Sequence, residues 1–328
     1  MQPVATAPST SNRPSAAGSP QCPIVLACDE GYAMPLATTL RSLADSNRAH
    51  WPLDVHVLTD GFSDAARERV LRSQPDGAMQ IRWIPVDLQS YEEFRLLDHV
   101  SRMTFARLQI PQVFGADVAR VLYLDADILV LGDLGPLWRS DLAGAPVGAV
   151  IDHHVDADLK LGRHHRTRGV PRVAHYFNAG ILLIELAAWR RDRVSERATD
   201  YLRRHSASPY ADQDALNVAC DGAWKPLDRT WNFQDHHCTR LGRIPAGRRP
   251  AIVHFITSSK PWKPSSSSVN AGLYEEFRDR TQFRRSTEEK LVATLSTLSW
   301  RIHHRVKRLN SRRQAPVPQL AAREEERA

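Results

Sequence analysis

The arrangement of apolar runs between residues 23 and 264 constrains the fold of this chain most. Short runs with the length of strands alternate there with segments whose apolar residues recur at helical spacing. Such alternation predicts an α/β fold, in which helices flank a mainly parallel sheet and ligands bind at the carboxyl ends of the strands. The predicted strands are Ile24–Cys28, Leu53–Thr59, Met79–Val86 and Val121–Leu124, and the helices between them are Pro35–Leu43 and Ser63–Leu71, with Ser63 as N-cap.

The second half of the chain is less regular. We predict strands over Phe177–Leu186 and Ile252–His254, a charged surface helix over Ala187–His205 and a short helix over Asp212–Cys220. Together with the length of 328 residues, these segments predict a single α/β domain over residues 22–264. A disordered segment rich in Ser, Pro and Ala is expected before it, over residues 1–21, and a helical extension after it, over residues 265–328.

Composition excludes several classes of protein. The chain is 42% hydrophobic and 25% charged and has no apolar run of about 18 residues, so no transmembrane helix is expected. The first twenty residues contain no continuous apolar stretch, which argues against a secretory signal. Four cysteines without CxxC spacing argue against a zinc site or a disulfide framework. The sequence therefore favours the reducing cytoplasm.

The C-terminal extension concentrates much of the net charge of +7. Apolar residues at steps of three and four predict one helix face, and after Lys290 no acid occurs before Gln314. The helix either docks on the domain through this apolar stripe or lies on an anionic membrane surface, and we favour the membrane, which would make the protein peripheral on the inner face of the cell membrane. No nucleic-acid-binding motif is present. The stripe is Leu291, Leu295, Leu298, Ile302, Val306 and Leu309, and the basic residues are Lys290, Arg301, Arg305, Lys307, Arg308, Arg312 and Arg313.

Two carboxylates one residue apart, Asp125 and Asp127, end the buried strand Val121–Leu124. Carboxylates at such a place are costly unless they are paired or bind a metal. Mg²⁺ or Mn²⁺ prefers oxygen ligands and leaves positions open for phosphate oxygens. Asp29 follows the first strand and is predicted at the same edge of the sheet.

His254 also follows a predicted strand, and Lys260 lies six residues further on. The intervening Thr257, Ser258 and Ser259 predict a loop whose N–H groups and Lys260 meet a diphosphate, while His254 completes the metal shell. Without such a ligand, His254 would be a structural histidine.

At this point the chain resembles glycosyltransferase family 8, above all its bacterial lipopolysaccharide galactosyl- and glucosyltransferases. The resemblance covers roughly Pro23 to Trp262. Its motifs, in order, are Ile24–Tyr32 (IVLACDEGY), Thr104–Leu108 (TFARL), Val121–Asp127 (VLYLDAD), Tyr176–Ile184 (YFNAGILLI), Asp212–Leu216 (DQDAL) and His254–Trp262 (HFITSSKPW).

The resemblance implies a GT-A type, Rossmann-like fold, a UDP-hexose donor, Mn²⁺ or Mg²⁺, and transfer with retention of anomeric configuration. It implies Asp125, Asp127 and His254 as metal ligands, and places donor contacts at each family motif. Thr257 stands where the family often has Gly, and Gly31 stands where a polar residue is often found. The implied donor contacts are Ala27, Asp29 and Tyr32 at the uracil, Arg107, Thr257 and Lys260 along the diphosphate, Asn178, Asp212 and Gln213 at the hexose, and Ala126, with Asp152 near the sugar and the acceptor.

The catalytic route is predicted from Gln213. An amide is a poor nucleophile, so we favour front-face attack, with Gln213 stabilising the positive sugar. Asp214 is the covalent alternative, although a carboxylate at a helix N-terminus is favoured by the macrodipole in any case. The expected activity moves galactose or glucose from a UDP-sugar to a saccharide or lipid-linked glycan acceptor. The alternatives are a non-catalytic nucleotide-sugar-binding protein and a self-glucosylating primer of the glycogenin type.

Overall fold

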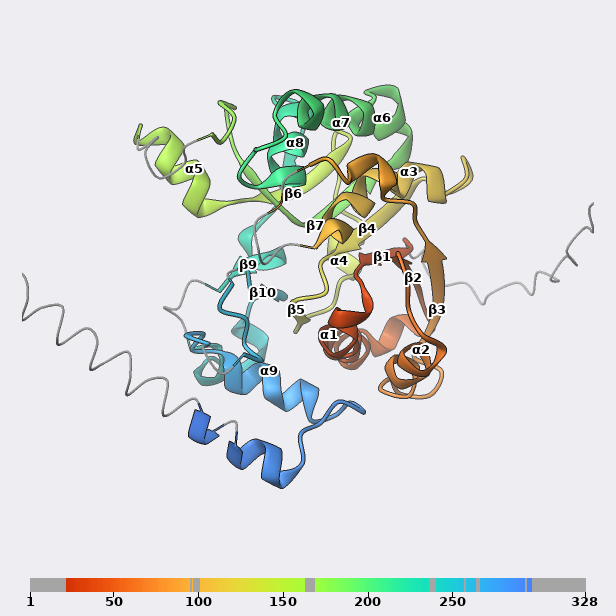
Figure 1. Cartoon of the computed structure of the whole chain (residues 1–328), viewed down its shortest axis with the longest axis vertical. Coiled ribbons are helices and arrows are strands. Elements are labelled where there is room, and N and C mark those ends of the chain that lie inside the picture. The colour runs from red at the N-terminus through yellow and green to blue at the C-terminus, as the bar shows by residue number, and fades with distance from the viewer. Residues whose placement is uncertain are drawn as a thin grey trace, which may run out of the picture.

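The computed structural model describes residues 22–94, 96, 101–162, 169–235, 240–256, 258–263, 266–292 and 294–296. Its centre is a seven-stranded sheet with the order β3-β2-β1-β4-β7-β6-β8 (Figure 1). The strands are β1 (Ile24–Ala27), β2 (Leu53–Thr59), β3 (Met79–Pro85), β4 (Arg120–Leu124), β6 (Val147–Ile151), β7 (Phe177–Glu185) and β8 (Lys225–Pro226).

The predicted mainly parallel sheet is confirmed. The pairs β1–β2, β2–β3, β1–β4 and β6–β8 are parallel, whereas β7 runs antiparallel to both β4 and β6. Because β1, β2 and β4 run the same way, the residues that follow each of them meet at one edge of the sheet.

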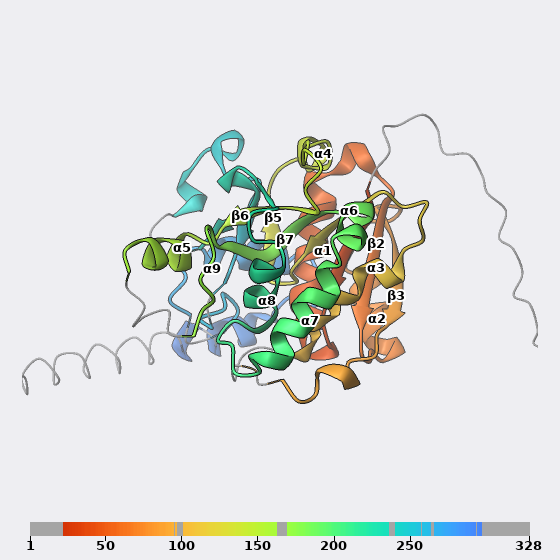
Figure 2. The ribbon, with the colours of Figure 1, turned by 90° about the horizontal axis from the view of Figure 1, so that it is seen from above.

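Helices cover both faces of the sheet. α1 and α2 share a core with Ile24 and Leu26, and α7 and α8 share a second core with Val25 and Leu58. Figure 2 shows α7 and α8 across the front of the sheet. Ser63 caps α2 as predicted, since its side chain accepts from Ala66 N–H. The helices are α1 (Ala33–Ser46), α2 (Asp64–Leu71), α3 (Ile110–Val113), α4 (Gly135–Trp138), α5 (His153–Lys160), α6 (Leu186–Arg191), α7 (Val194–Arg204), α8 (Ala211–Ala219) and α9 (Ala271–Arg278).

The prediction of a single helix over Ala187–His205 was wrong. The structure has two helices there, α6 and α7, because Arg193 adopts a left-handed conformation with φ 51° between them. A left-handed residue ends the run of i→i−4 hydrogen bonds.

A second, three-stranded sheet was not predicted. It pairs β10 (Ile252–His254) antiparallel with β5 (Ile128–Val130) and parallel with β9 (Phe233–Gln234). His254 lies opposite Ile128 in this register, and Phe255 N–H donates to Asp127 O at 3.1 Å. The small sheet therefore brings His254 beside the two aspartates that follow β4.

The packed unit extends beyond the predicted boundary at residue 264. Leu273, Tyr274 and Phe277 of α9 share a third core with Leu129 and Val253, so this helix is held against the small sheet. The predictions for residues 1–21 and for most of the C-terminal extension concern residues outside those that the structure describes.

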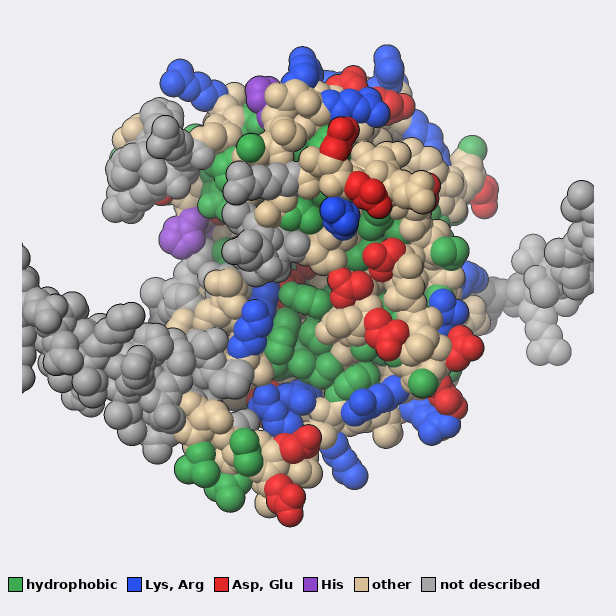
Figure 3. Space-filling view, viewed as in Figure 1, with side chains coloured by type: hydrophobic (Ala, Val, Ile, Leu, Met, Phe, Trp, Pro, Cys, Tyr) green, Lys and Arg blue, Asp and Glu red, His purple; other side chains and the backbone are tan. Residues whose placement is uncertain are grey.

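A last helical segment begins at residue 287 with a capping box. Ser286 N–H donates to Glu289 Oε2, and Glu289 N–H donates to Ser286 Oγ. Leu291 and Leu295 of the predicted stripe are 61% and 56% exposed, so they do not pack on the domain. Figure 3 shows apolar side chains at the lower edge of this face, over that segment. Among the described residues, no helix is long and apolar enough to span a membrane.

Candidate active site

A cavity of about 630 Å³ opens at the carboxyl ends of β1 and β4. It gathers nearly all the side chains predicted to act, although they come from segments far apart in the sequence. Thr257 lies outside the described residues, and Asp214 does not line the cavity. The predicted residues that do are Ala27, Asp29, Tyr32, Arg107, Asp125, Ala126, Asp127, Asp152, Asn178, Asp212, Gln213, His254 and Lys260.

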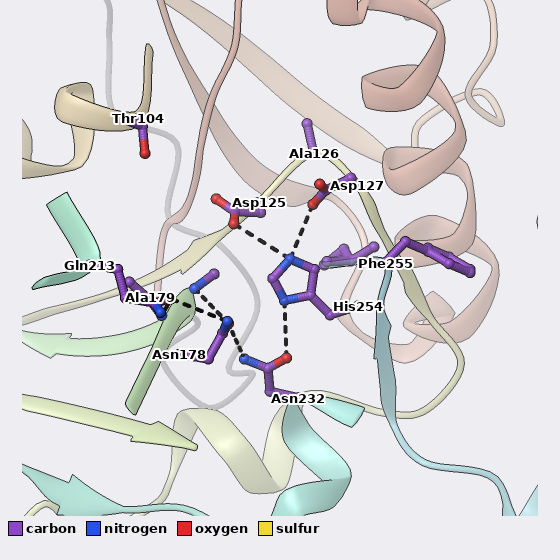
Figure 4. A network of polar contacts seen from close by, with 12 residues as sticks. Thr104, Asp125, Ala126, Asp127, Asn178, Ala179, Gln213, Asn232, His254 and Phe255 are labelled. Atoms are coloured by element: carbon purple, nitrogen blue, oxygen red, sulfur yellow. Dashed lines mark hydrogen bonds and ion pairs between the residues drawn. The ribbon is translucent and has the colours of Figure 1, made fainter. Parts of the chain in front are cut away.

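Asp125, Asp127 and His254 form a cluster suited to a divalent cation, because each offers a ligand atom within 4.8 Å of the others (Figure 4). His254 Nε2 lies 3.2 Å from Asp127 Oδ1 and 3.6 Å from Asp125 Oδ2. Asp127 Oδ1 is buried and makes no hydrogen bond within the part of the chain that the structure describes. A buried carboxylate oxygen without a donor fits a position that a cation fills. Two carboxylates and an imidazole therefore suit Mn²⁺ or Mg²⁺.

Two buried basic side chains, Lys260 and Arg107, offset the negative charge of these carboxylates. Lys260 Nζ donates to Asp127 Oδ2 at 2.5 Å and to Phe255 O at 2.7 Å. Although burial opposes ionisation, the Lys260 ammonium holds the pKa of Asp127 well below its usual range. Arg107 donates from Nη2 to Asp125 Oδ1 at 3.0 Å. Lys260, expected to face a diphosphate, thus contacts a carboxylate of the metal cluster.

Arg107 also ties the cluster to the next carboxylate. Its Nε lies 3.0 Å from Asp212 Oδ2, and Thr104 Oγ1 donates to the other oxygen of Asp212. Burial raises the pKa of Asp212 to about 6, against the opposing effect of Arg107. Arg107 itself is 6% exposed and lies over the Tyr123 ring. The Arg107 guanidinium therefore lies between Asp212 and the cluster of Asp125, Asp127 and His254.

A β-bulge in β7 shapes the other end of the cavity. The pairing with β6 shifts so that Val150 lies opposite Asn178 while Ala149 lies opposite Leu182. The residues in between direct backbone groups to side chains: Ala179 N–H donates to Gln213 Oε1, and Gly180 N–H donates to Asn178 Oδ1, both at 3.0 Å. Bulges next to active sites re-aim groups in this way.

The amides of Gln213 and Asn178 meet the Asp152 carboxylate. Both donate to Asp152 Oδ2 at 3.4 Å, while Asp152 Oδ1 caps α5 by accepting from two backbone N–H groups. Asn178 also donates to Gln213 Oε1 at 3.2 Å. Amides and a carboxylate that face a cavity offer both donors and acceptors, which suits hydroxyl groups.

Asp29 and Tyr32 follow β1 and line the cavity. Asp29 Oδ2 accepts from Ser101 Oγ at 2.6 Å, and the Tyr32 ring packs edge-on against Trp262 with centroids 5.9 Å apart. Trp262 packs in turn on Tyr274, so it supports the wall of this pocket.

Asp214 lies behind the cavity wall. Its side chain is fully buried and accepts from Tyr176 OH, Ser208 Oγ and Tyr210 N–H at 2.5, 2.6 and 2.9 Å. A carboxylate held by three donors away from the cavity anchors the loop before α8. Asp214 therefore does not face the cavity.

Asn232 contacts His254 of this cluster, and the sequence did not predict its part in the site. Its Oδ1 faces His254 Nδ1 at 3.1 Å, and its Nδ2 donates to Asn178 Oδ1 at 2.8 Å. A lone Asn in a loop carries no pattern that would single it out.

Comparisons with known proteins identify the family of this chain. The profile of glycosyl transferase family 8 matches residues 23–265. General stress protein A of Bacillus subtilis is 27% identical over 79% of this chain and 94% of its own length. Lipopolysaccharide 1,3-galactosyltransferase of Salmonella typhimurium is 27% identical over 71% of this chain and 69% of its own length.

Among solved structures, the galactosyltransferase LgtC, crystallised with donor and acceptor sugar analogues, superposes with a TM-score of 0.68. It is 29% identical and covers 81% of this chain and 98% of its own. The mainly parallel sheet with helices on both faces and this likeness define a GT-A type fold. A profile match over most of the chain, with the fold and the motifs in agreement, means that the chain belongs to glycosyl transferase family 8.

Proposed function

We propose that this glycosyltransferase moves a hexose, galactose or glucose, from a UDP-sugar to a glycan or lipid-linked acceptor, with a divalent metal and with retention of anomeric configuration. One observation carries the proposal. A single cavity joins a cluster suited to Mn²⁺ or Mg²⁺, at Asp125, Asp127 and His254, to the fixed amides of Asn178 and Gln213. A diphosphate on the cluster would place its sugar against the amides.

The residues have distinct roles in this proposal. A divalent cation at the cluster supplies charge stabilisation for the departing diphosphate. Lys260, already within the cluster, adds a donor to phosphate oxygens. Ala27, Asp29 and Tyr32 hold the uracil end, and Ala126 lies along the path of the donor.

Gln213 is proposed to stabilise the positive charge on the sugar. Ala179 N–H fixes the carbonyl oxygen of Gln213, so that its direction is set before a donor binds. The attacking acceptor hydroxyl would then approach on the face that the diphosphate leaves and give its proton to a phosphate oxygen. This front-face route assigns no chemical step to Asp214, whose carboxylate is engaged behind the wall.

The acceptor class is drawn from the relatives. Lipopolysaccharide 1,2-glucosyltransferase of Escherichia coli and the Salmonella galactosyltransferase act on lipopolysaccharide. We propose for this chain an acceptor of the same kind, a saccharide or a lipid-linked glycan, and a role in lipopolysaccharide biosynthesis. Asp152, within reach of Gln213 and Asn178, lies where sugar and acceptor would meet.

The C-terminal segment is proposed to bind an anionic membrane surface from the cytoplasm. The exposure of Leu291 and Leu295 supports this over docking on the domain. Apolar residues on one helix face beside basic ones are typical of interfacial helices.

Donor hydrolysis tests the enzyme without a known acceptor. The protein is incubated with UDP-glucose or UDP-galactose and Mn²⁺, and release of UDP is measured. We expect hydrolysis of one of the two donors, its loss with a chelator, and its loss in Asp127→Ala with the fold intact. Hydrolysis by a folded Asp127→Ala protein at the wild-type rate would contradict the metal site.

Two alternatives give different results. A non-catalytic binding protein would bind UDP yet release none from either donor. A self-glucosylating primer would gain hexose units in its own mass spectrum during the incubation.

A further inference from the structure

Asn232 occupies a position between the metal cluster and the sugar-binding amides (Figure 4). It follows the 3₁₀ turn Arg229–Trp231 and directly precedes β9, which pairs with β10 beside His254. Its side chain is 1% exposed, and it is not among the residues that line the cavity. Any effect of Asn232 on a bound ligand therefore passes through the residues that it touches.

The direction of each hydrogen bond in this chain of contacts follows from one backbone group. Gly180 N–H can only donate, and it donates to Asn178 Oδ1 at 3.0 Å. That oxygen is an acceptor, so the Asn232 atom 2.8 Å away must be the amide nitrogen. The other end of the Asn232 amide, its oxygen, consequently faces His254 Nδ1 at 3.1 Å.

An oxygen in that place selects one form of the imidazole. Because Oδ1 of Asn232 only accepts, Nδ1 of His254 carries a hydrogen. In a neutral ring the lone pair then lies on Nε2, which points at Asp125 and Asp127. A hydrogen on Nε2 would instead point at Asp127 Oδ1, 3.2 Å away, where the cation is proposed to bind.

We infer that Asn232 is a positioning residue, which fixes the Nδ1–H tautomer of His254 and is itself oriented by its hydrogen bond to Asn178. The inference rests on the metal site of the proposed function. A partner on the far nitrogen of a ligating histidine sets ring orientation, and its loss typically costs about 10–100-fold in metal affinity. Here the partner is the neutral amide of Asn232. Asn178 and Gly180 of β7 set the orientation of that amide, so the orientation of the His254 ring depends on this strand.

Two variants separate the two contacts. Asn232→Ala removes both. Asn232→Asp keeps an acceptor for His254 but places an oxygen against Asn178 Oδ1, so it breaks only the link to Asn178. Asn47→Ala is a matched control, since Asn47 is 2% exposed and hydrogen-bonded to Leu43 and Leu134.

The first readout is the nitrogen spectrum of the histidine-labelled, metal-free protein, at a pH where the ring is neutral, with His254 assigned by its absence in His254→Gln. We expect the Nδ1–H tautomer in wild type, Asn232→Asp and Asn47→Ala, and its loss in Asn232→Ala. The second readout is Mn²⁺ binding, followed by the paramagnetic signal of the free ion. We expect about 10–100-fold weaker binding in Asn232→Ala, and wild-type binding in Asn232→Asp.

The outcomes distinguish this inference from the proposed function. An unchanged His254 spectrum and unchanged Mn²⁺ affinity in folded Asn232→Ala would overturn the role of Asn232. Should Asn232→Ala not fold, loss of the Nδ1–H tautomer in Asn232→Asp would overturn it equally. If wild type binds no Mn²⁺, the proposed metal dependence fails, and the spectrum of the metal-free protein still decides the role of Asn232.

Discussion

Gly180→Ala tests whether the bulge in β7 fits the metal cluster as closely as the structure indicates. A β-carbon at Gly180 would lie 2.2 Å from His254 Cε1, 2.6 Å from Asp125 Oδ2 and 2.8 Å from His254 Nδ1. Carbon makes favourable contacts at about 3.5–4.0 Å, so the imidazole would have to move by about 1 Å. Asn232 and the pairing of β10 oppose that movement.

The expected losses follow from these distances. Forcing an extra methyl group into a packed site costs about 1–3 kcal/mol of unfolding free energy. A misplacement of about 1 Å in a catalytic group costs about 100-fold in rate. We therefore expect Gly180→Ala to stay folded, with slightly lower thermal stability, and to lose about two orders of magnitude in donor hydrolysis and most of its Mn²⁺ binding.

Gly272→Ala is the matched control, because nothing lies within 4 Å of a β-carbon there and Ala favours the helix α9. It should hydrolyse donor at the wild-type rate. If Gly180→Ala keeps Mn²⁺ binding and hydrolysis within a factor of about two, the backbone of β7 does not hold the ligands as argued.

Three further predictions concern charge. Lys260→Ala should cost about 1.5–3 kcal/mol of UDP affinity and leave uridine binding unchanged. Lys263→Ala, at an exposed position, should change neither affinity. If calorimetry shows equal losses for UDP and uridine in Lys260→Ala, Lys260 does not contact phosphate. Because the native pKa of Asp212 is raised from 3.8 to about 6, the native protein binds this proton more tightly than the unfolded chain, and the unfolding free energy should fall as pH rises between about 4 and 6, by at most about 3 kcal/mol. Asp212→Asn should flatten that part of the denaturation profile, and two parallel profiles would contradict the assignment. A chain truncated after Ser286 should still hydrolyse donor but lose the binding to anionic vesicles that full-length protein shows at low salt and loses at high salt; an insoluble truncated protein would mean that the stripe packs on the domain.

The strands that were predicted have apolar runs that stand apart from their surroundings, although the equally apolar β6 was not predicted. β2 agrees with its prediction to the residue, and β1, β3 and β4 within one. β5 was not predicted because its three apolar residues follow Asp127 directly, and β9 was not predicted because it has only two residues. Strands this short are defined by their partners, which a local pattern does not contain.

The site was predicted as a set of residues but not as a set of contacts. The motifs named Asp127 and Lys260, yet the hydrogen bond between them joins residues 133 positions apart. Asp214 was named from its place beside Gln213, whereas its burial behind the wall depends on Tyr176 and Ser208, which approach from other segments. Asn232 lacks any local signal, because its role consists only of tertiary contacts.

The basic side chains buried among the carboxylates have a consequence for how the protein would respond to a lack of metal. Lys260 lies against Asp127, and Arg107 lies between Asp125 and Asp212. Each carboxylate thus has a basic partner without a metal, and we expect the domain to stay folded under chelation, in contrast to small zinc modules that unfold. If a divalent cation binds here as proposed, we expect it to enter and leave with each diphosphate, so that a lack of metal would stop the reaction without unfolding the enzyme.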